Sequence, residues 1–76
     1  MPAPQRARIT YSIFPAELHI GDRFTDADGE WEIASRPLAF THGHEIRARV
    51  RRIGDPRTLR NISWPAQKRL AIRRPS

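Results

Sequence analysis

Within residues 44–53, HEIRARVRRI, polar and apolar residues alternate one by one from Glu45 to Arg51. In an extended chain this alternation places Ile46 and Val50 on one side, and Arg47 and Arg49 on the other. A period of two residues is typical of a β-strand with one buried and one exposed face. The other ordered segments follow the same period rather than the 3.6-residue period of an amphipathic helix, so the sequence predicts an all-β protein.

The length and the absence of cysteine limit what this fold contains. With 76 residues the chain forms one domain, and so short a chain buries only about 60% of the surface that it exposes when unfolded. Such a core leaves little room for a deep substrate pocket, so we do not expect an enzyme. No cysteine is present, which excludes disulfides and thiolate zinc sites. We expect a flexible basic arm at 1–8 and a domain at 9–74.

The first hairpin is marked by Asp28-Gly29, a pair that favours a tight turn because glycine adopts positive φ without steric cost. Two registers are compatible with the sequence. A two-residue loop pairs Phe24 with Ile33, whereas a four-residue loop pairs Phe24 with Trp31. Both registers place these three side chains on one face, so their burial is predicted in either case.

A second hairpin is expected around the segment His-Gly-His at 42–44. A three-residue loop there pairs Phe40 with Ile46 and Leu38 with Ala48, which makes both pairs apolar. A two-residue loop sets Phe40 against Glu45 instead. We therefore predict the three-residue loop, with Leu38 and Phe40 facing the core.

The remaining turn residues divide the chain into five short strands, a pattern that predicts a small barrel, closed or half-open. A break is expected near Pro37, because proline has no N–H to donate to a sheet. Residues 64–67 are expected to form one helical turn before a last strand at 68–73. The predicted core consists of the apolar residues that face inward: Ile9, Tyr11, Ile13, Leu18, Ile20, Phe24, Trp31, Ile33, Leu38, Phe40, Ile46, Ala48, Val50, Leu59, Ile62, Leu70 and Ile72.

Three short motifs resemble those of Src-homology-3-like small β-barrels. They are ELHIGDRF at 17–24, GEWEIA at 29–34 and NISWPAQKRLAIRR at 61–74. The resemblance spans residues 9–74 and implies a five-stranded barrel with one helical turn before the last strand. It also implies a scaffold whose bacterial and archaeal versions often bind nucleic acid, ribosomes, polymerase or a protein partner. It does not extend to a proline-peptide groove, because Glu32 stands where that family has a second aromatic residue.

Charge is distributed unevenly along the chain, whose net charge is +6. Residues 17–32 carry six acids and one arginine, whereas residues 33–76 carry ten arginines and one lysine against two acids. Two poles of opposite sign produce an oriented field that steers an anionic partner. Thirteen of the fourteen basic residues are arginines, whose planar guanidinium group binds phosphate or carboxylate through two hydrogen bonds.

The alternating arginines predict a surface that binds nucleic acid through its phosphates. Successive outward residues of a strand lie about 6.6–6.8 Å apart, close to the roughly 7 Å between phosphates of one DNA strand. Trp64 is the best candidate for stacking on a base, and the alternative is that it caps one end of the barrel. The candidate nucleic-acid-binding residues are Arg47, Arg49, Arg51, Arg57, Arg60, Trp64, Lys68, Arg69 and Arg73.

Two other interpretations of the arginines remain open. In the first, they only meet water and form cross-strand ion pairs with Glu30, Glu32 and Glu45, each worth about 0.2–1 kcal/mol. In the second, they bind an acidic protein surface. The predicted function is thus a non-catalytic basic module that binds DNA or RNA. The alternative is a small regulatory module that binds a protein through its charged face or a sheet edge.

Other kinds of site find little support in the sequence. His42 and His44 flank a glycine without further metal ligands, and Asp26 and Asp28 begin no complete calcium loop. We therefore expect no metal, no cofactor, no catalytic residues and no small-molecule substrate. No apolar run approaches the ~20 residues of a membrane helix, and no secretory signal is recognised at the N-terminus. We expect no membrane partner and a cytoplasmic protein.

Overall fold

The structure, a computed structural model, describes residues 10–74. The expected arm at 1–8 and the expected burial of Ile9 lie outside the described residues. The all-β prediction is confirmed, because residues 10–74 form seven strands and one turn of 3-10 helix. In chain order the elements are β1 (Thr10–Ile13), η1 (Pro15–Glu17), β2 (Arg23–Asp26), β3 (Gly29–Ile33), β4 (Leu38–Phe40), β5 (Glu45–Arg52), β6 (Asp55–Pro65) and β7 (Leu70–Arg73).

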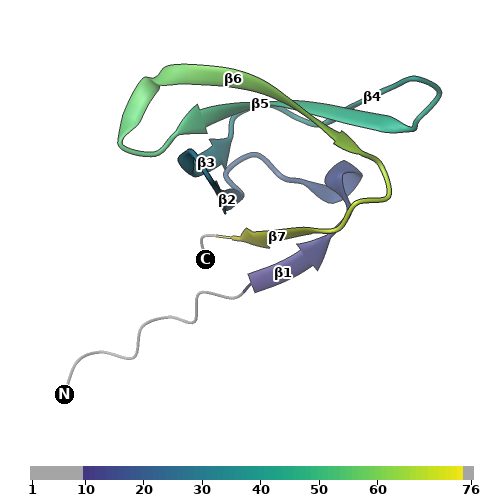
Figure 1. The fold of residues 1–76 in the computed structure, drawn as a ribbon, viewed down its shortest axis with the longest axis horizontal. Coiled ribbons are helices and arrows are strands. Elements are labelled where there is room, and N and C mark those ends of the chain that lie inside the picture. Colours follow the sequence, from purple (N-terminus) through teal and green to yellow (C-terminus); the bar gives the residue numbers. More distant parts are fainter. Residues whose placement is uncertain (1–9, 75–76) are drawn as a thin grey trace.

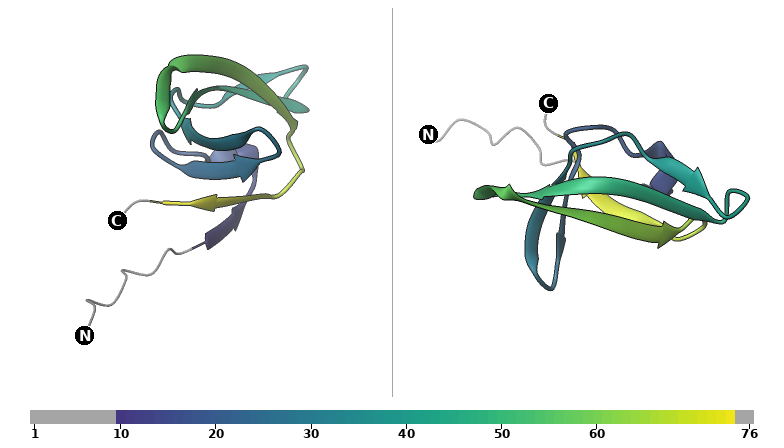
Figure 2. Two further views of the ribbon diagram at one scale, coloured as in Figure 1. Left: turned by 60° about the vertical axis from the view of Figure 1, so that its left-hand side comes forward. Right: turned by 90° about the horizontal axis from the view of Figure 1, so that it is seen from above.

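The strands form one antiparallel sheet that curls into a half-barrel (Figure 1, Figure 2). Neighbouring strands follow the order β1-β7-β2-β3-β5-β4, and β6 pairs with the other edge of β5. β3 and β4 lie end to end along β5, where β3 pairs with residues 50–52 and β4 with residues 45–47. The described chain therefore has seven strands rather than the expected five, in part because β3 and β4 are two short strands along one edge of β5.

The break between β3 and β4 falls where it was predicted. Ala34 still donates its N–H to the carbonyl of Arg49 (2.8 Å), and the N–H of Arg49 is accepted by the Ser35 hydroxyl (2.8 Å). A side chain thus replaces the backbone partner that the sheet lacks at this point. Pro37 has no N–H to restore the ladder, so regular pairing resumes only at Leu38.

The β2–β3 hairpin adopts the second of the two registers considered. Phe24 pairs with Trp31, and Asp26 pairs with Gly29. Gly29 has φ +132°, a conformation that favours glycine. The Asp26 carboxylate accepts the N–H of Asp28 (2.8 Å) and so closes the turn. Trp31 is fully buried, as both registers predicted.

The register predicted for the β4–β5 hairpin is wrong by one residue. Phe40 pairs with Glu45 and Leu38 pairs with Arg47. A shift of one residue moves every side chain of a strand to the opposite face. Leu38 and Phe40 accordingly lie on the outer face of the sheet, where they are 61% and 39% exposed.

The cause of this shift is the conformation of the turn. Thr41, His42 and Gly43 all have positive φ values, 54°, 54° and 84°. Two hydrogen bonds close the turn, from Gly43 N–H to the Phe40 carbonyl and from His44 N–H to the Thr41 carbonyl (3.0 Å each). Residues 41–44 therefore connect the strands in the alternative register, with Phe40 against Glu45, rather than in the register of the three-residue loop. Non-glycine residues with positive φ are uncommon, so this conformation was not anticipated.

The helical turn expected at 64–67 is also absent from its predicted place. β6 continues in extended form to Pro65, and Ala66 N–H donates to the His44 carbonyl (2.8 Å), which prolongs the pairing with β5. A tight turn follows, closed by Lys68 N–H and the Pro65 carbonyl (3.0 Å). Within residues 10–74 the one helical turn is η1, where Pro15 starts the turn and restricts its own φ.

The core lies between the inner faces of the curled sheet. Most of the predicted core is confirmed, and the buried apolar residues are Ile13, Leu18, Trp31, Ile33, Ile46, Ala48, Val50, Trp64 and Ile72. The partly buried residues packed against them are Tyr11, Phe24, Ile62 and Leu70. Besides Leu38 and Phe40, the prediction fails for Ile20 and Leu59, which are 60% and 48% exposed. Ile20 lies in a turn, and Leu59 pairs with Arg51 on the outer face.

Candidate nucleic-acid interface

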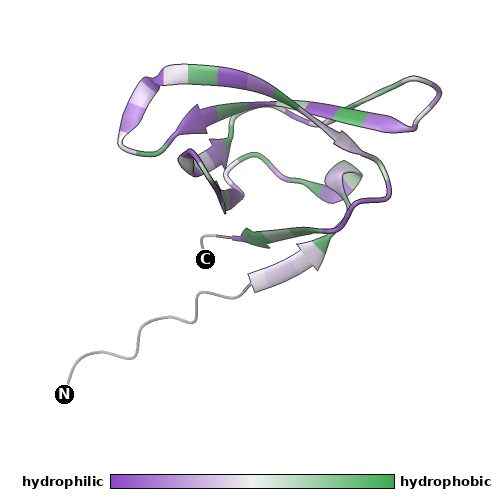
Figure 3. Cartoon of the chain, viewed as in Figure 1, coloured by the Kyte–Doolittle hydropathy of each residue, from purple (hydrophilic) through white to green (hydrophobic). Residues whose placement is uncertain are grey.

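Hydrophilic and hydrophobic residues alternate along β5 (Figure 3), and their alternating burial gives the strand an arginine face and an apolar face, as predicted. Ile46, Ala48 and Val50 are buried in the core, whereas the side chains of Arg47, Arg49 and Arg51 are exposed on the outer face. Their spacing along the strand is about 6.8 Å from one arginine to the next. These three guanidinium groups form the centre of the candidate interface.

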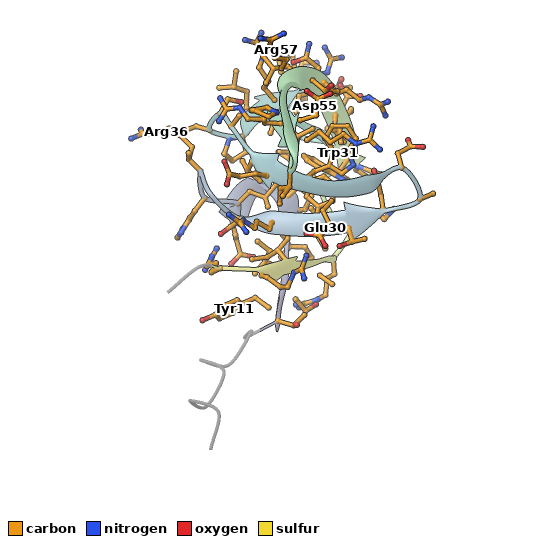
Figure 4. All side chains as sticks on the ribbon, turned by 90° about the vertical axis from the view of Figure 1, so that its left-hand side faces the viewer. Tyr11, Glu30, Trp31, Arg36, Asp55 and Arg57 are labelled. Atoms are coloured by element: carbon orange, nitrogen blue, oxygen red, sulfur yellow. The ribbon has the colours of Figure 1, made fainter. Side chains whose placement is uncertain are left out.

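β6 extends the same face through its pairing with β5. Arg49 lies opposite Asn61 and Arg51 lies opposite Leu59. Arg57 precedes Leu59 by two residues and is exposed near the tip of the β5–β6 hairpin. Figure 4 shows Arg57 at this tip, on the far side of the hairpin from Trp31. We refer to Arg47, Arg49, Arg51 and Arg57 as the arginine stripe.

Arg60 does not belong to the arginine stripe, although the sequence predicted that it binds nucleic acid together with Arg47 and Arg49. It pairs with Val50 and therefore projects toward the inner face. Its guanidinium lies 4.8 Å from the ring centroid of Trp31 and 3.1 Å from the Asp28 carboxylate. Arg52 also lies over Trp31 (5.5 Å) and donates to the Asp28 carbonyl. These two arginines hold the β2–β3 turn against the hairpin.

The remaining predicted cations lie on other parts of the molecule. Arg69 lies over the ring of Phe14 at 4.5 Å. Arg73 contacts the Glu30 carboxylate at 3.5 Å. Lys68 is exposed in the turn after β6. The nine predicted residues therefore do not form one surface, because alternation within a strand reveals its two faces but not where the next strand lies around the barrel.

Trp64 is buried and is not available to stack on a base. It is only 8% exposed, pairs with Ile46, and meets Phe24 edge-on with ring centroids 6.0 Å apart. The prediction of an exposed Trp64 is wrong. Its pairing with Ile46 places it on the inner face, where it belongs to the core.

Every carboxylate side chain in the protein is engaged with a neighbour. Five of the eight acids form ion pairs with arginines: Asp22, Asp28, Glu30, Glu32 and Glu45. The other three accept hydrogen bonds, Glu17 from Phe14, Asp26 from Trp31 and Asp55 from Thr58. The cross-strand ion pairs expected for Glu30 and Glu32 are confirmed, whereas Glu45 pairs with Arg47 of its own strand. Because these acids are already engaged and basic residues outnumber them, the surplus surface charge is positive.

Neutralisation along the arginine stripe is uneven. Arg47 contacts Glu45 at 2.7 Å, and Arg51 contacts Glu32 at 3.8 Å. No ion pair involves Arg49 or Arg57 within residues 10–74. The cross-strand partner of Arg49 is the neutral Asn61. The stripe thus alternates between compensated and uncompensated cations.

Two carboxyl groups have lowered pKa values. Partial desolvation acts to raise the pKa of Asp26, but hydrogen bonds from Trp31, Asp28 and Gly29 and the charge of Arg60 lower it below 3.8. Hydrogen bonds from Ser63 and Arg47 lower the pKa of Glu45 below 4.5, against a smaller opposing effect of desolvation. Glu45 is therefore ionised at neutral pH and holds Arg47 in place.

Three findings bear on other functions. No three His, Asp or Glu side chains in the described chain come close enough together to hold a metal ion. The same part of the chain contains no helix long and apolar enough to span a membrane. Comparisons with models of protein families, with curated proteins and with solved structures found no match.

Proposed function

We propose that this protein is a non-catalytic module that binds nucleic acid through phosphate contacts from the arginine stripe. The observation that carries the proposal is that Arg49 and Arg57 are exposed beside compensated arginines and have no acid partner within residues 10–74. The proposed surface is smaller than the nine residues taken from the sequence. Arg60, Arg69 and Arg73 are engaged in contacts elsewhere.

The spacing of the stripe matches a polyanion better than a single carboxylate. Arg47, Arg49 and Arg51 repeat at about 6.8 Å, close to the roughly 7 Å repeat of phosphates along one strand. Each guanidinium offers a planar pair of donors that suits a phosphate. The half-barrel is compatible with the Src-homology-3-like scaffold that the motifs resemble, and this supports a binding module rather than an enzyme.

The proposal is tested by titrating fluorescently labelled oligonucleotides at two salt concentrations. Neutralising about three to four phosphates gives a slope of log K against log salt of roughly −2 to −4. We expect Arg49→Glu to weaken binding about tenfold or more, because it replaces a charge-assisted hydrogen bond by repulsion.

The matched control is Arg36→Glu. Arg36 is also exposed, but it lies in the break between β3 and β4 and is not on β5 or β6 (Figure 4). The control makes the same change in net charge and is expected to reduce affinity far less. Equal losses from both variants would show attraction by net charge alone and would contradict a defined interface.

A second candidate function rests on the edge of β6. The eleven-residue strand Asp55–Pro65 pairs with β5 on one side, and no other strand of the described chain pairs with it. An exposed strand edge is a site where an extended peptide adds a strand. Binding of this kind protects β6 amides from hydrogen exchange and is insensitive to Arg49→Glu, which distinguishes it from the first candidate.

A further inference from the structure

A shallow groove of about 400 Å³ opens on the outer face beside the arginine stripe. It lies where the break between β3 and β4 leaves β5 without a regular neighbour. Leu38 and Phe40 supply its apolar surface, and Arg47 and Arg49 supply its charge. Asn61 reaches it from β6. The groove is therefore continuous with the surface proposed to bind phosphates.

The apolar side chains of this groove lie there because of the register of the hairpin. The four-residue turn places Leu38 beside Arg47 and Phe40 beside Glu45 on the outer face. Both apolar side chains are substantially exposed, Leu38 at 61% and Phe40 at 39%. In so small a protein, apolar residues on the outer face that add nothing to the core point to contact with a ligand.

The cations of the groove play two different parts. The guanidinium of Arg47 lies over the ring of Phe40 at 4.3 Å and is fixed by Glu45 at 2.7 Å. It therefore forms a flat cationic surface on an aromatic ring, against which another planar group stacks. Arg49 has neutral neighbours in Ser35 and Asn61, so its charge is available to an anion.

These features match an unpaired nucleotide. A duplex presents phosphates outside and keeps the faces of its bases stacked inside, so apolar side chains beside its backbone gain nothing. A single strand exposes base faces that stack on aromatic rings and guanidinium planes. We infer that the ligand is single-stranded nucleic acid, with a base in the Leu38–Phe40 groove and its neighbouring phosphates on Arg49 and Arg51. The inference rests on the proposed function and narrows its ligand class.

The experiment compares three labelled oligonucleotides of equal length at one low salt concentration. They are an oligothymidylate, its duplex with oligoadenylate, and a strand of abasic residues that keeps the phosphates but lacks bases. We expect the oligothymidylate to bind about tenfold or more tighter than the other two. The abasic strand tests the contribution of the bases without altering the protein.

Variants of the groove provide the second measurement. Phe40→Ala and Leu38→Ala are expected to weaken binding of oligothymidylate by roughly five- to 100-fold, the range found when a stacking side chain is removed. Binding of the duplex and of the abasic strand stays unchanged. The matched control is Leu59→Ala, because Leu59 is 48% exposed on the same face but lies beside Arg51, outside the groove. It is expected to leave all three affinities unchanged.

The outcomes separate this inference from the proposed function. Equal, salt-sensitive binding of all three oligonucleotides overturns the inference and leaves the phosphate-binding function standing. If none of the three oligonucleotides binds, both the inference and the proposed function are overturned. A third outcome is that an acidic peptide binds the wild type but not Leu38→Ala, while all three oligonucleotides bind equally. This result assigns the groove to a protein partner and also overturns the inference. Fluorescence of the buried Trp31 and Trp64 confirms that each variant is folded.

Discussion

At the scale of single residues, Asp22 is the charged side chain that the fold encloses most completely among those described. It is 1% exposed. Its carboxylate accepts the N–H of His19 (2.8 Å) and contacts the guanidinium of Arg74 at 3.0 and 3.4 Å. One buried carboxylate therefore ties the turn before β2 to the chain that follows β7. The sequence indicated only that Asp22 was one of several acids in a negative segment.

We predict that Asp22→Ala lowers the free energy of unfolding by about 1–3 kcal/mol, because buried donors lose a charged acceptor. Urea unfolding followed by tryptophan fluorescence measures this loss. The control is Glu30→Ala, which removes an exposed ion pair with Arg73 and is expected to cost about 0–1 kcal/mol. Similar losses in the two variants would mean that burial of Asp22 adds nothing to its ion pair.

At the scale of elements, alternation predicted strands well and turns poorly. The inward and outward faces of β5 are as expected, because a period of two directly reports a half-buried strand. The β4–β5 turn was predicted wrongly, because two non-glycine residues, Thr41 and His42, adopt positive φ there. Nothing in the sequence marks these residues for that conformation. Because of the shifted register, Leu38 and Phe40, which were expected in the core, line the groove on the outer face.

The strained turn gives a prediction at this scale. Thr41 is β-branched and has φ 54°, a conformation that asparagine tolerates much better. We expect Thr41→Asn to raise the free energy of unfolding by about 0.5–1 kcal/mol. Thr25→Asn is the matched control, because Thr25 lies in the extended strand β2, where asparagine is disfavoured. If both Thr41→Asn and Thr25→Asn were more stable than the wild type, the gain at Thr41 would not come from its positive φ.

At the scale of the whole molecule, stability at acid pH depends on the two carboxyl groups with lowered pKa values. The pKa of Asp26 is below 3.8 in the folded protein, so the unfolded chain takes up a proton first as the pH falls. Its contribution to stability is complete above about pH 4 and is lost as the pH falls through the folded pKa. Glu45 behaves in the same way around its ordinary value of 4.5.

We therefore predict that unfolding free energy falls less steeply between pH 5 and pH 2 in Asp26→Asn than in the wild type. Asparagine still accepts the hydrogen bond from Trp31 but has no proton to bind. Thermal or urea unfolding at several pH values measures the slope. The Thr25→Asn protein retains the Asp26 and Glu45 carboxyl groups and should follow the wild-type curve. Parallel curves for Asp26→Asn and the wild type would exclude Asp26 as a source of the acid sensitivity.

The fold class, most of the core and the arginines of β5 were predictable from the sequence. The candidate surface was predictable only in part, since the positions of Arg60 and Arg69 depend on how the sheet curls. Trp64 was misassigned because its neighbour Pro65 suggested a turn, whereas β6 continues through that proline in extended form. Pairing between strands, rather than the pattern within one strand, decided each of these cases.

The long unpaired margin of β6 also affects how copies of this protein meet in a concentrated solution. When two such margins join antiparallel in the register centred on Arg60, Arg60 of one copy lies directly opposite Arg60 of the other. Like charges directly across a ladder destabilise it. Fibrous self-association through this margin is thus discouraged, while a foreign segment with a carboxylate at that position meets attraction instead.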